Sequence, residues 1–187
     1  MTEKEKMQRQ MLYDANYDAD LLKERMFAKE LCYDYNQLRP SAVQAQKEIL
    51  QKLLGKMGGE VCILAPFWCD YGYNIEVGEN FFANHNTVIL DGGKVTFGNN
   101  VFLAPNCGFY TAGHPLDAGQ RNQGLEYANP IAVGNDVWIG AGVHVMPGVK
   151  IGNNVVIGGG SVVVKDIPGN SLAVGNPCRV IRKLAEP

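Results

Sequence analysis

The sequence predicts a mainly β protein, built as a solenoid of short parallel strands with a small helical segment at its N-terminus. Two observations predict the strands: apolar residues return at every sixth position over most of the chain, and glycine and asparagine fill the positions between them. A period of six matches neither a lone helix nor a hairpin. A third observation, the near-helical spacing of apolar residues before residue 57, predicts the helices.

Residues 1–57 are expected to form an N-terminal helical cap. Apolar residues in the stretch 18–36 recur at close to helical spacing, and a second helix is predicted over 41–54. Ser41, with Gln44 three residues later, has the pattern of a capping box, in which side chains satisfy free backbone N–H groups. Gly55 follows as a plausible C-terminal stop. We expect both helices to cover one end of the solenoid.

Residues 58–187 are expected to form the solenoid domain and its closing segment. Three short strands joined by tight corners make one triangular coil, and stacked coils bury one apolar side chain at each edge. Glycine and asparagine tolerate the backbone angles of such corners. In the block 133–167, the first positions of the repeat are Val133, Ile139, Val145, Ile151, Ile157 and Val163, and the fifth positions are Val137, Val143, Val149, Val155, Ser161 and Ile167.

The repeat also runs through the first half of the chain, and then it stops. Two additional residues interrupt it in "LDGGKVTFG", and it lapses altogether from Phe109 to Pro130. We therefore expect two arrays, at about 65–109 and 131–167, with a projecting loop at about 109–130 between them. The upstream positions that keep the phase are Val77, Ala83, Ile89, Phe97, Leu103 and Phe109.

Composition excludes several classes of protein. The apolar fraction is 46%, which argues against disorder, and the formal net charge of −2 argues against nucleic acid or an anionic membrane as the main partner. The chain shows no apolar signal segment and no run long enough to span a membrane. We expect a cytoplasmic protein whose five cysteines are reduced packing residues.

The interruption holds "TAGHPLD", and in it one of only three histidines of the chain, His114. Histidine is the natural proton acceptor near neutral pH, although a lone histidine in a loop is more often an ordinary surface residue. The other two, His85 and His144, occupy different phases of the repeat and form no HxxxxH pair. We therefore expect no metal site.

The repeat together with its interruption resembles the hexapeptide-repeat acyltransferases, and most closely the maltose and galactoside O-acetyltransferases among them. The stretches that carry the resemblance are "CDYGYNI", "FFAN", "TAGHPLD", "RNQGLEY", "VGNDVWIGAGV", "PGVKIGNNVVIGGGSVV", "KDIP" and "VGNPCRVIRKL". The resemblance implies a left-handed parallel β-helix, a homotrimer, and transfer of an acetyl group from acetyl-CoA to a sugar such as maltose or glucose. It places the acetyl-CoA sites in grooves between neighbouring chains, with the loop projecting across the boundary.

The resemblance also implies roles for individual residues. His114 matches the catalytic base, which removes the proton of the attacking hydroxyl so that no covalent enzyme intermediate is needed. Glu126 is a hypothesis of our own: it orients His114 or stabilises its protonated form, and a solvated loop carboxylate is an equally good reading. The acceptor-binding residues carried over are Asp14, Asp70, Phe82 and Asn84.

Four positions separate this chain from the galactoside pattern. Those enzymes have serine, tyrosine and methionine where this chain has Asp70, Phe82 and Glu126, and Gly92 replaces an aspartate that binds the galactoside. These departures favour the maltose-type pattern.

For acetyl-CoA, the resemblance implies small residues along the path of the molecule, one residue that forms a wall of its binding channel, and cations that bind its phosphates. Backbone amides near Ala141 would bind the thioester carbonyl oxygen, as in an oxyanion hole. Ordinary surface charge and solenoid packing are the alternative readings, and they are serious for Lys165 and Trp138. The residues carried over are Trp138, Ala141, Gly159, Val164, Lys165, Arg179 and Arg182.

Two other functions stay open at this point. An enzyme of the same fold could acylate another acceptor, such as an antibiotic, serine or a nucleotide sugar. A trimeric solenoid without catalysis could serve as a scaffold, although that class needs neither the His114 loop nor the cluster of Lys165, Arg179 and Arg182.

Overall fold

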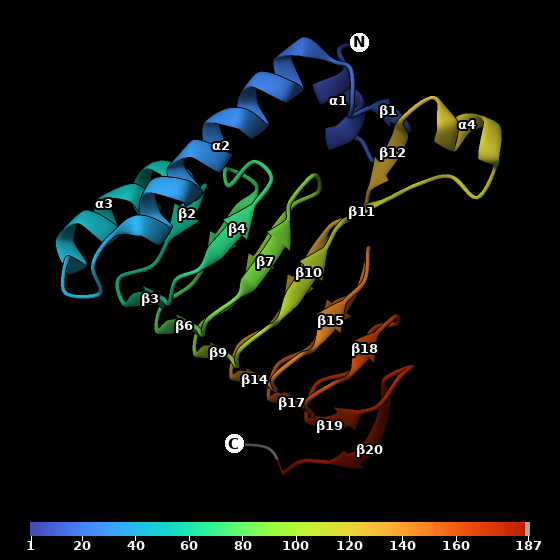
Figure 1. The fold of residues 1–187 in the computed structure, drawn as a ribbon. Coiled ribbons are helices and arrows are strands. Elements are labelled where there is room, and N and C mark those ends of the chain that lie inside the picture. Colours follow the sequence, from blue (N-terminus) through green and yellow to red (C-terminus); the bar gives the residue numbers. More distant parts are fainter. Residues whose placement is uncertain (186–187) are drawn as a thin grey trace.

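The computed structural model describes residues 1–185 and consists of a triangular solenoid with helices along one edge (Figure 1). Three sheets form its faces. The β2 face contains β2 (Lys56–Met57), β5 (Ile75–Val77), β8 (Val95–Phe97), β13 (Ile131–Val133) and β16 (Lys150–Ile151). The β3 face contains β3 (Val61–Ile63), β6 (Phe81–Ala83), β9 (Val101–Leu103), β14 (Val137–Ile139), β17 (Val155–Ile157), β19 (Ser171–Val174) and β20 (Arg179–Lys183). The β4 face contains β4 (Phe67–Cys69), β7 (Thr87–Leu90), β10 (Gly108–Tyr110), β15 (His144–Val145) and β18 (Val162–Val163).

Successive coils pair through parallel strands, as the six-residue period predicts, and only β20 closes its face as an antiparallel strand. The predicted left-handed parallel β-helix is confirmed. Every first and fifth position of the repeat in the block 133–167 is at most 4% exposed, Ser161 included. The interior of the solenoid is therefore a stack of these side chains, and the period records the spacing of its edges.

The conformation of the corners explains why asparagine recurs in the six-residue repeat. Within the solenoid, the residues other than glycine that have positive φ are all Asn or Asp, the types that tolerate this conformation best. Their side chains also bond from coil to coil: the Asn80 amide donates to Asn100 at 2.9 Å, and the Asn100 amide donates to Asp136 at 2.8 Å. The residues with positive φ are Asn80, Asn86, Asn100, Asn106, Asp136, Asn154 and Asn170.

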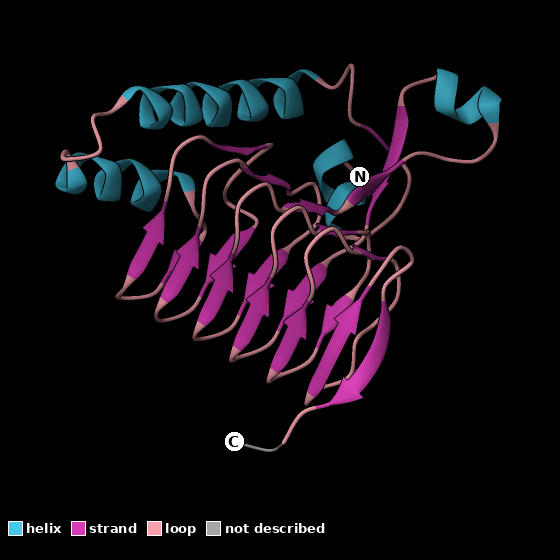
Figure 2. Ribbon diagram, turned by 60° about the horizontal axis from the view of Figure 1, so that its bottom comes forward, coloured by secondary structure: helices cyan, strands magenta, loops and turns pink. Residues whose placement is uncertain are grey.

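Helices cover the first coils along one edge (Figure 2): α1 (Glu3–Gln8), α2 (Ala19–Gln37) and α3 (Val43–Leu53). The helices predicted over 18–36 and 41–54 are confirmed to within two residues. The predicted capping box at Ser41 is wrong, because the N-cap of α3 is Ala42 and no side chain bonds its N–H groups. The real capping box is at Thr2 and Glu5, which begin the unpredicted α1.

Gly55 ends α3 for a reason other than the one expected. It does not adopt positive φ; instead, a side chain there would lie 2.1 Å from the Tyr73 carbonyl oxygen. The glycine is needed because the chain passes directly over the first corner of the solenoid.

The interruption forms an arm over residues 111–130. It consists of β11 (Ala112–Gly113), α4 (Ala118–Asn122) and β12 (Leu125–Ala128), and α4 stands away from the solenoid (Figure 1). Phe109, expected at the start of the loop, still belongs to β10 and is fully buried. β12 pairs with β11 on one side and with β1 (Tyr13–Asp14) on the other, so the N-terminal segment holds the base of the arm.

The outward sides of the faces differ in polarity. The β2 face presents Lys56, Glu76, Thr96, Ala132 and Lys150 in register. The β3 face presents a column of Cys62, Phe82, Phe102, Trp138, Val156 and Leu172. The β4 face presents Trp68, Val88, Gly108, His144 and Val162. Two faces are thus largely apolar toward the outside and one is polar. No helix among residues 1–185 has the length and apolarity that a membrane span requires.

Candidate functional site

His114 lies just beyond β11, where the arm leaves its short hairpin. Its Nδ1 is 3.1 Å from the carbonyl oxygen of Leu125 on β12. A carbonyl can only accept, so this contact places the proton of the neutral ring on Nδ1 and leaves a free lone pair on Nε2. The His114 side chain is 49% exposed, so Nε2 can reach a molecule from outside. His114 is therefore set up as a proton acceptor.

Glu126 stands close to the free nitrogen of His114. Its Oε1 is 3.9 Å from Nε2, beyond hydrogen-bond distance but within range of a charge interaction, and its side chain is only 15% exposed. Burial raises the pKa of Glu126, while His114 and the Tyr13 hydroxyl oppose that rise. The ring is oriented by Leu125, and the carboxylate faces the atom that would carry the new proton.

Tyr13 is a member of the site that sequence reasoning missed. Its hydroxyl donates to Glu126 Oε2 at 3.2 Å, and the residue is 1% exposed. The pairing of β1 with β12 puts Tyr13 directly opposite Glu126, so the contact follows from strand register. In the sequence, Tyr13 stands in "LYDAN", a stretch that lies before the repeat and shows no periodic signal.

Asp14 and Asp70 lie at the same end of the molecule as His114. Asp14 is opposite Leu125 in the β1–β12 pair, and its Oδ1 accepts from the N–H groups of Asn16 and Tyr17. Asp70 follows β4 and lines a cleft of about 280 Å³ together with Arg25. Burial raises the pKa of Asp70, and Arg25 and Lys29 lower it.

A buried carboxylate, Asp91, supports the loop that carries Asp70. Its Oδ1 accepts from the N–H groups of Asp70 and Tyr71 at 3.0 and 2.9 Å. Its Oδ2 finds no partner among residues 1–185, and burial raises the pKa of Asp91 to about 6. The signal in the sequence was the two-residue insertion "LDGG", because an addition to a strict repeat marks a local departure from the coil.

Phe82 and Asn84 do not join this group within one chain. Phe82 lies on the outer side of the β3 face, and Asn84 precedes β7. Asp70 follows β4, the parallel neighbour of β7, so Asn84 and Asp70 lie at opposite ends of the β4 face. At about 3.3 Å per strand residue, their separation is on the order of 15 Å. The predicted acceptor residues therefore fall into two separate groups.

Of the residues predicted for acetyl-CoA, Trp138, Ala141 and Gly159 lie with the second group, whereas Val164 and Lys165 lie at the end of the β4 face that carries Asp70. Trp138 is 56% exposed in the apolar column of the β3 face. Ala141 and Gly159 follow β14 and β17, at the corner between the β3 and β4 faces. A side chain on Gly159 would lie 3.0 Å from the Ala141 carbonyl oxygen, which explains the glycine there. Val164 and Lys165 follow β18, and Arg179 and Arg182 lie on β20; all four are exposed.

The backbone N–H of Ala141 differs from the N–H groups of its two neighbours. The N–H groups of its neighbours Gly140 and Gly142 donate to Ile157 and Pro105. Ala141 is an exposed residue, and no acceptor for its N–H is found within residues 1–185. This donor is free to bind an oxygen of another molecule.

The remaining histidines lie apart from His114. His85 is exposed, and its Nδ1 contacts the Ala65 carbonyl. His144 is half-buried, because it stacks on Tyr110 and its Nδ1 is 3.1 Å from the Tyr110 hydroxyl. Residues 1–185 contain no group of three His, Cys, Asp or Glu side chains that could hold a metal ion.

Comparison with known proteins matches both parts of the chain. Residues 6–58 match the maltose acetyltransferase hexapeptide capping motif, and residues 130–165 match the bacterial transferase hexapeptide model of six repeats. A Saccharomyces cerevisiae protein whose name contains "acetyltransferase" is 57% identical over 175 residues, which is 94% of this chain and 89% of that protein.

Solved structures agree with these matches. A maltose O-acetyltransferase from Clostridium difficile 630 is 52% identical, with a TM-score of 0.98 over 100% of this chain and 99% of its own. A galactoside acetyltransferase in complex with coenzyme A is 40% identical, with a TM-score of 0.95 over 99% of this chain and 92% of its own. A hexapeptide-repeat acetyltransferase from Vibrio cholerae O1 biovar eltor, complexed with acetyl coenzyme A, is 35% identical, with a TM-score of 0.91 over the full length of both chains.

Proposed function

The chain belongs to the maltose and galactoside O-acetyltransferase family of hexapeptide-repeat acyltransferases, and on that basis we propose that it transfers the acetyl group of acetyl-CoA to a hydroxyl of a sugar such as maltose or glucose. The observation that carries the proposal is the arrangement of His114, with its proton fixed on Nδ1 by Leu125 and its free Nε2 facing Glu126. The coenzyme A and acetyl coenzyme A complexes of two relatives support the donor.

His114 acts as the general base of this reaction. Its Nε2 accepts the proton of the sugar hydroxyl while the hydroxyl oxygen attacks the thioester carbonyl carbon. The tetrahedral intermediate then expels the CoA thiolate, and the protonated His114 returns its proton to that sulfur. A positioned base of this kind contributes roughly 10²- to 10⁴-fold in rate.

Glu126 stabilises the imidazolium rather than orienting the ring. The 3.9 Å between Oε1 and Nε2 leaves room for the sugar hydroxyl to reach the nitrogen. Once Nε2 is protonated, a carboxylate that is 15% exposed attracts it more strongly than it would in water. Tyr13 holds that carboxylate in place and favours its ionised form.

The Ala141 N–H supplies the oxyanion-binding group. Residue Ala141 is exposed, and the N–H groups of its neighbours Gly140 and Gly142 are fixed by carbonyls of the following and the preceding coil. A rigid donor of this type stabilises a developing oxyanion without reorganising during the reaction, and such a donor is worth about 3–4 kcal/mol. Trp138 lines the path of acetyl-CoA, and Lys165, Arg179 and Arg182 bind the phosphates of acetyl-CoA.

The site is shared between two copies of the chain in a homotrimer. Asp14, Asp70, His114 and Glu126 lie at one end of the β4 face, while Asn84 and Ala141 lie at its other edge. The apolar outer columns of the β3 and β4 faces suit packing against neighbouring copies, and the polar β2 face suits solvent. A ring of three chains closes when the β3 side of each copy meets the arm side of the next.

The proposal is tested by following thiol release from acetyl-CoA with a panel of acceptors. Maltose and glucose are expected to support turnover above that seen with serine and chloramphenicol, and galactosides are expected to be poorer acceptors because of Asp70, Phe82, Gly92 and Glu126. Faster turnover with serine or chloramphenicol would identify a different acceptor class. Absence of both turnover and CoA binding would rule out the enzyme.

A further inference from the structure

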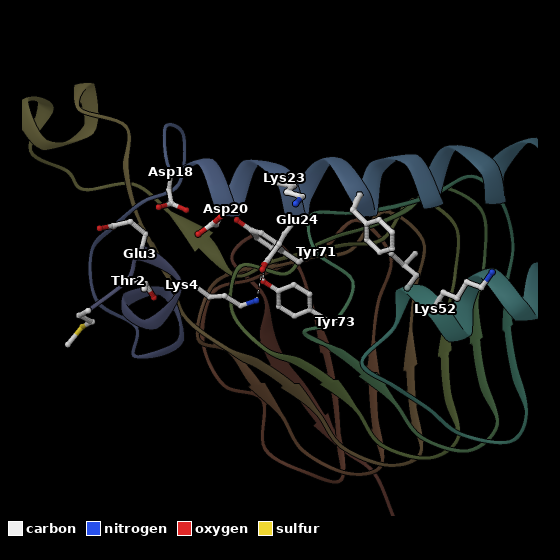
Figure 3. A pocket seen from close by; sticks show the side chains of 13 residues that line it. Thr2, Glu3, Lys4, Asp18, Asp20, Lys23, Glu24, Lys52, Tyr71 and Tyr73 are labelled. Carbon is white, nitrogen blue, oxygen red and sulfur yellow. Dashed lines mark hydrogen bonds and ion pairs between the residues drawn. The ribbon is translucent and has the colours of Figure 1, made fainter.

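A cavity larger than the cleft beside Asp70 lies against the other face of α2. Figure 3 shows the side chains that line it. The cleft beside Asp70 is lined by Leu22, Arg25, Met26 and Lys29 of this helix. Asp20, Lys23, Glu24 and Phe27 line the larger cavity, and at 100° per residue they form the opposite face of the helix. Its volume of about 800 Å³ suits a small organic molecule. None of His114, Glu126, Asp14 and Asp70 lines it.

One wall of this cavity is fixed by three polar side chains from separate elements. Glu24 of α2 bonds Lys4 of α1 through Oε1 at 2.7 Å and accepts from the Tyr73 hydroxyl through Oε2 at 2.7 Å. The Lys4 ammonium also lies 4.5 Å from the centre of the Tyr73 ring. Burial acts against the charge of Glu24, but the bonds from Lys4 and Tyr73 outweigh it and hold its pKa below the usual range. These donors and acceptors are therefore in place before a ligand arrives.

Aromatic rings supply the rest of the recognition surface. The rings of Tyr71 and Tyr73 lie 5.5 Å apart at an angle of 44°, and Phe27, which is 63% exposed, lines the same cavity. An exposed aromatic side chain over a polar wall is suited to a ligand with one apolar face and many hydroxyls. Among the lining side chains, carboxylates and ammonium groups are nearly balanced, which disfavours a strongly charged ligand.

We propose that this cavity is a second, non-catalytic binding site for a neutral carbohydrate, with one sugar ring lying against Tyr73 and Phe27 and its hydroxyls bonded to Glu24 and Lys4. The site goes beyond the proposed reaction, because it contains no residue of the proposed catalytic group. Its back wall does approach that group: Tyr71 packs in one buried cluster with Tyr13, the residue that holds Glu126.

The test measures binding of maltotriose by ligand-observed NMR, without acetyl-CoA, to the full chain carrying Asp70→Ala and Glu126→Gln. These substitutions weaken the proposed acceptor site and leave the second cavity intact. Maltotriose is expected to bind this background. Adding Phe27→Ala or Glu24→Gln is expected to raise its Kd about tenfold, since a lost ring contact or a lost charged hydrogen bond is worth on the order of 1 kcal/mol or more.

Tyr33→Ala is the matched control, because Tyr33 is also an aromatic residue of α2, is 57% exposed, and lines neither cavity. The proposal is overturned if the background does not bind maltotriose, or if Phe27→Ala and Glu24→Gln weaken binding no more than Tyr33→Ala. Tighter binding of glucose 6-phosphate than of maltotriose would overturn the neutral ligand class. Thiol release by the unsubstituted chain tests the transferase independently, so either proposal can fail alone.

Discussion

At the scale of single residues, a backbone carbonyl orients His114, the proposed proton acceptor. Leu125 fixes the tautomer of His114, and Glu126 is left free to face the nitrogen that changes its charge. The Tyr13 hydroxyl donates a hydrogen bond to the other carboxylate oxygen of Glu126, Oε2. In the proposed mechanism, one group orients the base and another stabilises its protonated form.

Tyr13→Phe tests that chain of contacts. Loss of a hydrogen bond to a charged group weakens the ionised form of Glu126, so the pKa of Glu126 rises further and the carboxylate protonates at higher pH. We expect kcat/KM to fall about tenfold, with its acid limb moved to higher pH. Tyr17→Phe is the control, because Tyr17 is 72% exposed.

A double substitution separates this role from simple packing. If Tyr13 acts through Glu126, Tyr13→Phe adds little to the loss already caused by Glu126→Gln. Additive losses, or a Tyr13→Phe profile parallel to that of the unsubstituted chain at every pH, would contradict a positioning role for Tyr13.

Asp91 gives a prediction about stability. Its pKa is about 6 in the folded chain, above its unfolded value, so the stability linked to its proton is complete below the unfolded pKa and is lost as pH rises through 6. Asp91→Asn keeps an oxygen for the N–H groups of Asp70 and Tyr71 and removes the charge.

Relative to the unsubstituted chain, the free energy of unfolding of Asp91→Asn is therefore expected to increase by about 2 kcal/mol between pH 4 and pH 8. Denaturant unfolding at a series of pH values measures it. A difference between the two proteins that does not change with pH would show that folding does not raise the pKa of Asp91.

At the scale of elements, the corners of the solenoid are as specific as its core. Asn100 combines a φ of 55° with two side-chain bonds, to Asn80 and Asp136, and thus joins three successive coils. Asn100→Ala is expected to destabilise the chain by about 2–3 kcal/mol, because it removes both bonds and strains the backbone.

Asn100→Gly separates the two contributions to that loss. It also removes the bonds but tolerates the positive φ, so it should lose about 1 kcal/mol less than Asn100→Ala. Thermal unfolding of both variants measures the difference. Equal losses would mean that the corner conformation is unstrained at this residue.

An element is predicted more accurately from the sequence when the six-residue repeat runs through it. In the block 133–167 the repeat predicts each buried edge residue, because a buried side chain at every sixth position leaves no other register. β2 and β3 lie before the predicted arrays, and β19 and β20 lie after them. The start of α3 is missed because Ser41 has the composition of a cap without its geometry, and α1 is missed because its six residues carry too little apolar pattern.

The site is predicted less completely, for a physical reason. His114 stands out because it lies where the six-residue period is interrupted. Asp91 could have been found in the same way, because it lies at the two-residue insertion "LDGG". Tyr13 cannot be found this way, because its contact with Glu126 joins residues 113 positions apart through the pairing of β1 with β12. The separation of Asp70 from Asn84 likewise depends on how strands stack, which local pattern does not reveal.

At the scale of the whole molecule, the proposed site needs a second chain. Co-expression of His114→Ala with Asn84→Ala tests this requirement, since each variant alone lacks one half of every site. Each mixed trimer then has one site of its three that combines an intact His114 from one copy with an intact Asn84 from its neighbour, which is about a quarter of all sites when the two variants assemble at random. Activity of the mixture well above that of either variant is expected. No recovery in mixed trimers of confirmed composition would mean that each site is built within one chain.

The central claim is that the histidine of the arm is the base for acetyl transfer, and the rate of CoA thiol release with maltose tests it most directly. His114→Ala is expected to lower kcat by roughly 10²- to 10⁴-fold while the chain stays folded and binds CoA. Gln120→Ala, on α4 of the same arm, is the matched control and is expected to retain the unsubstituted rate. A His114→Ala chain that keeps most of its maltose-dependent thiol release would contradict the account.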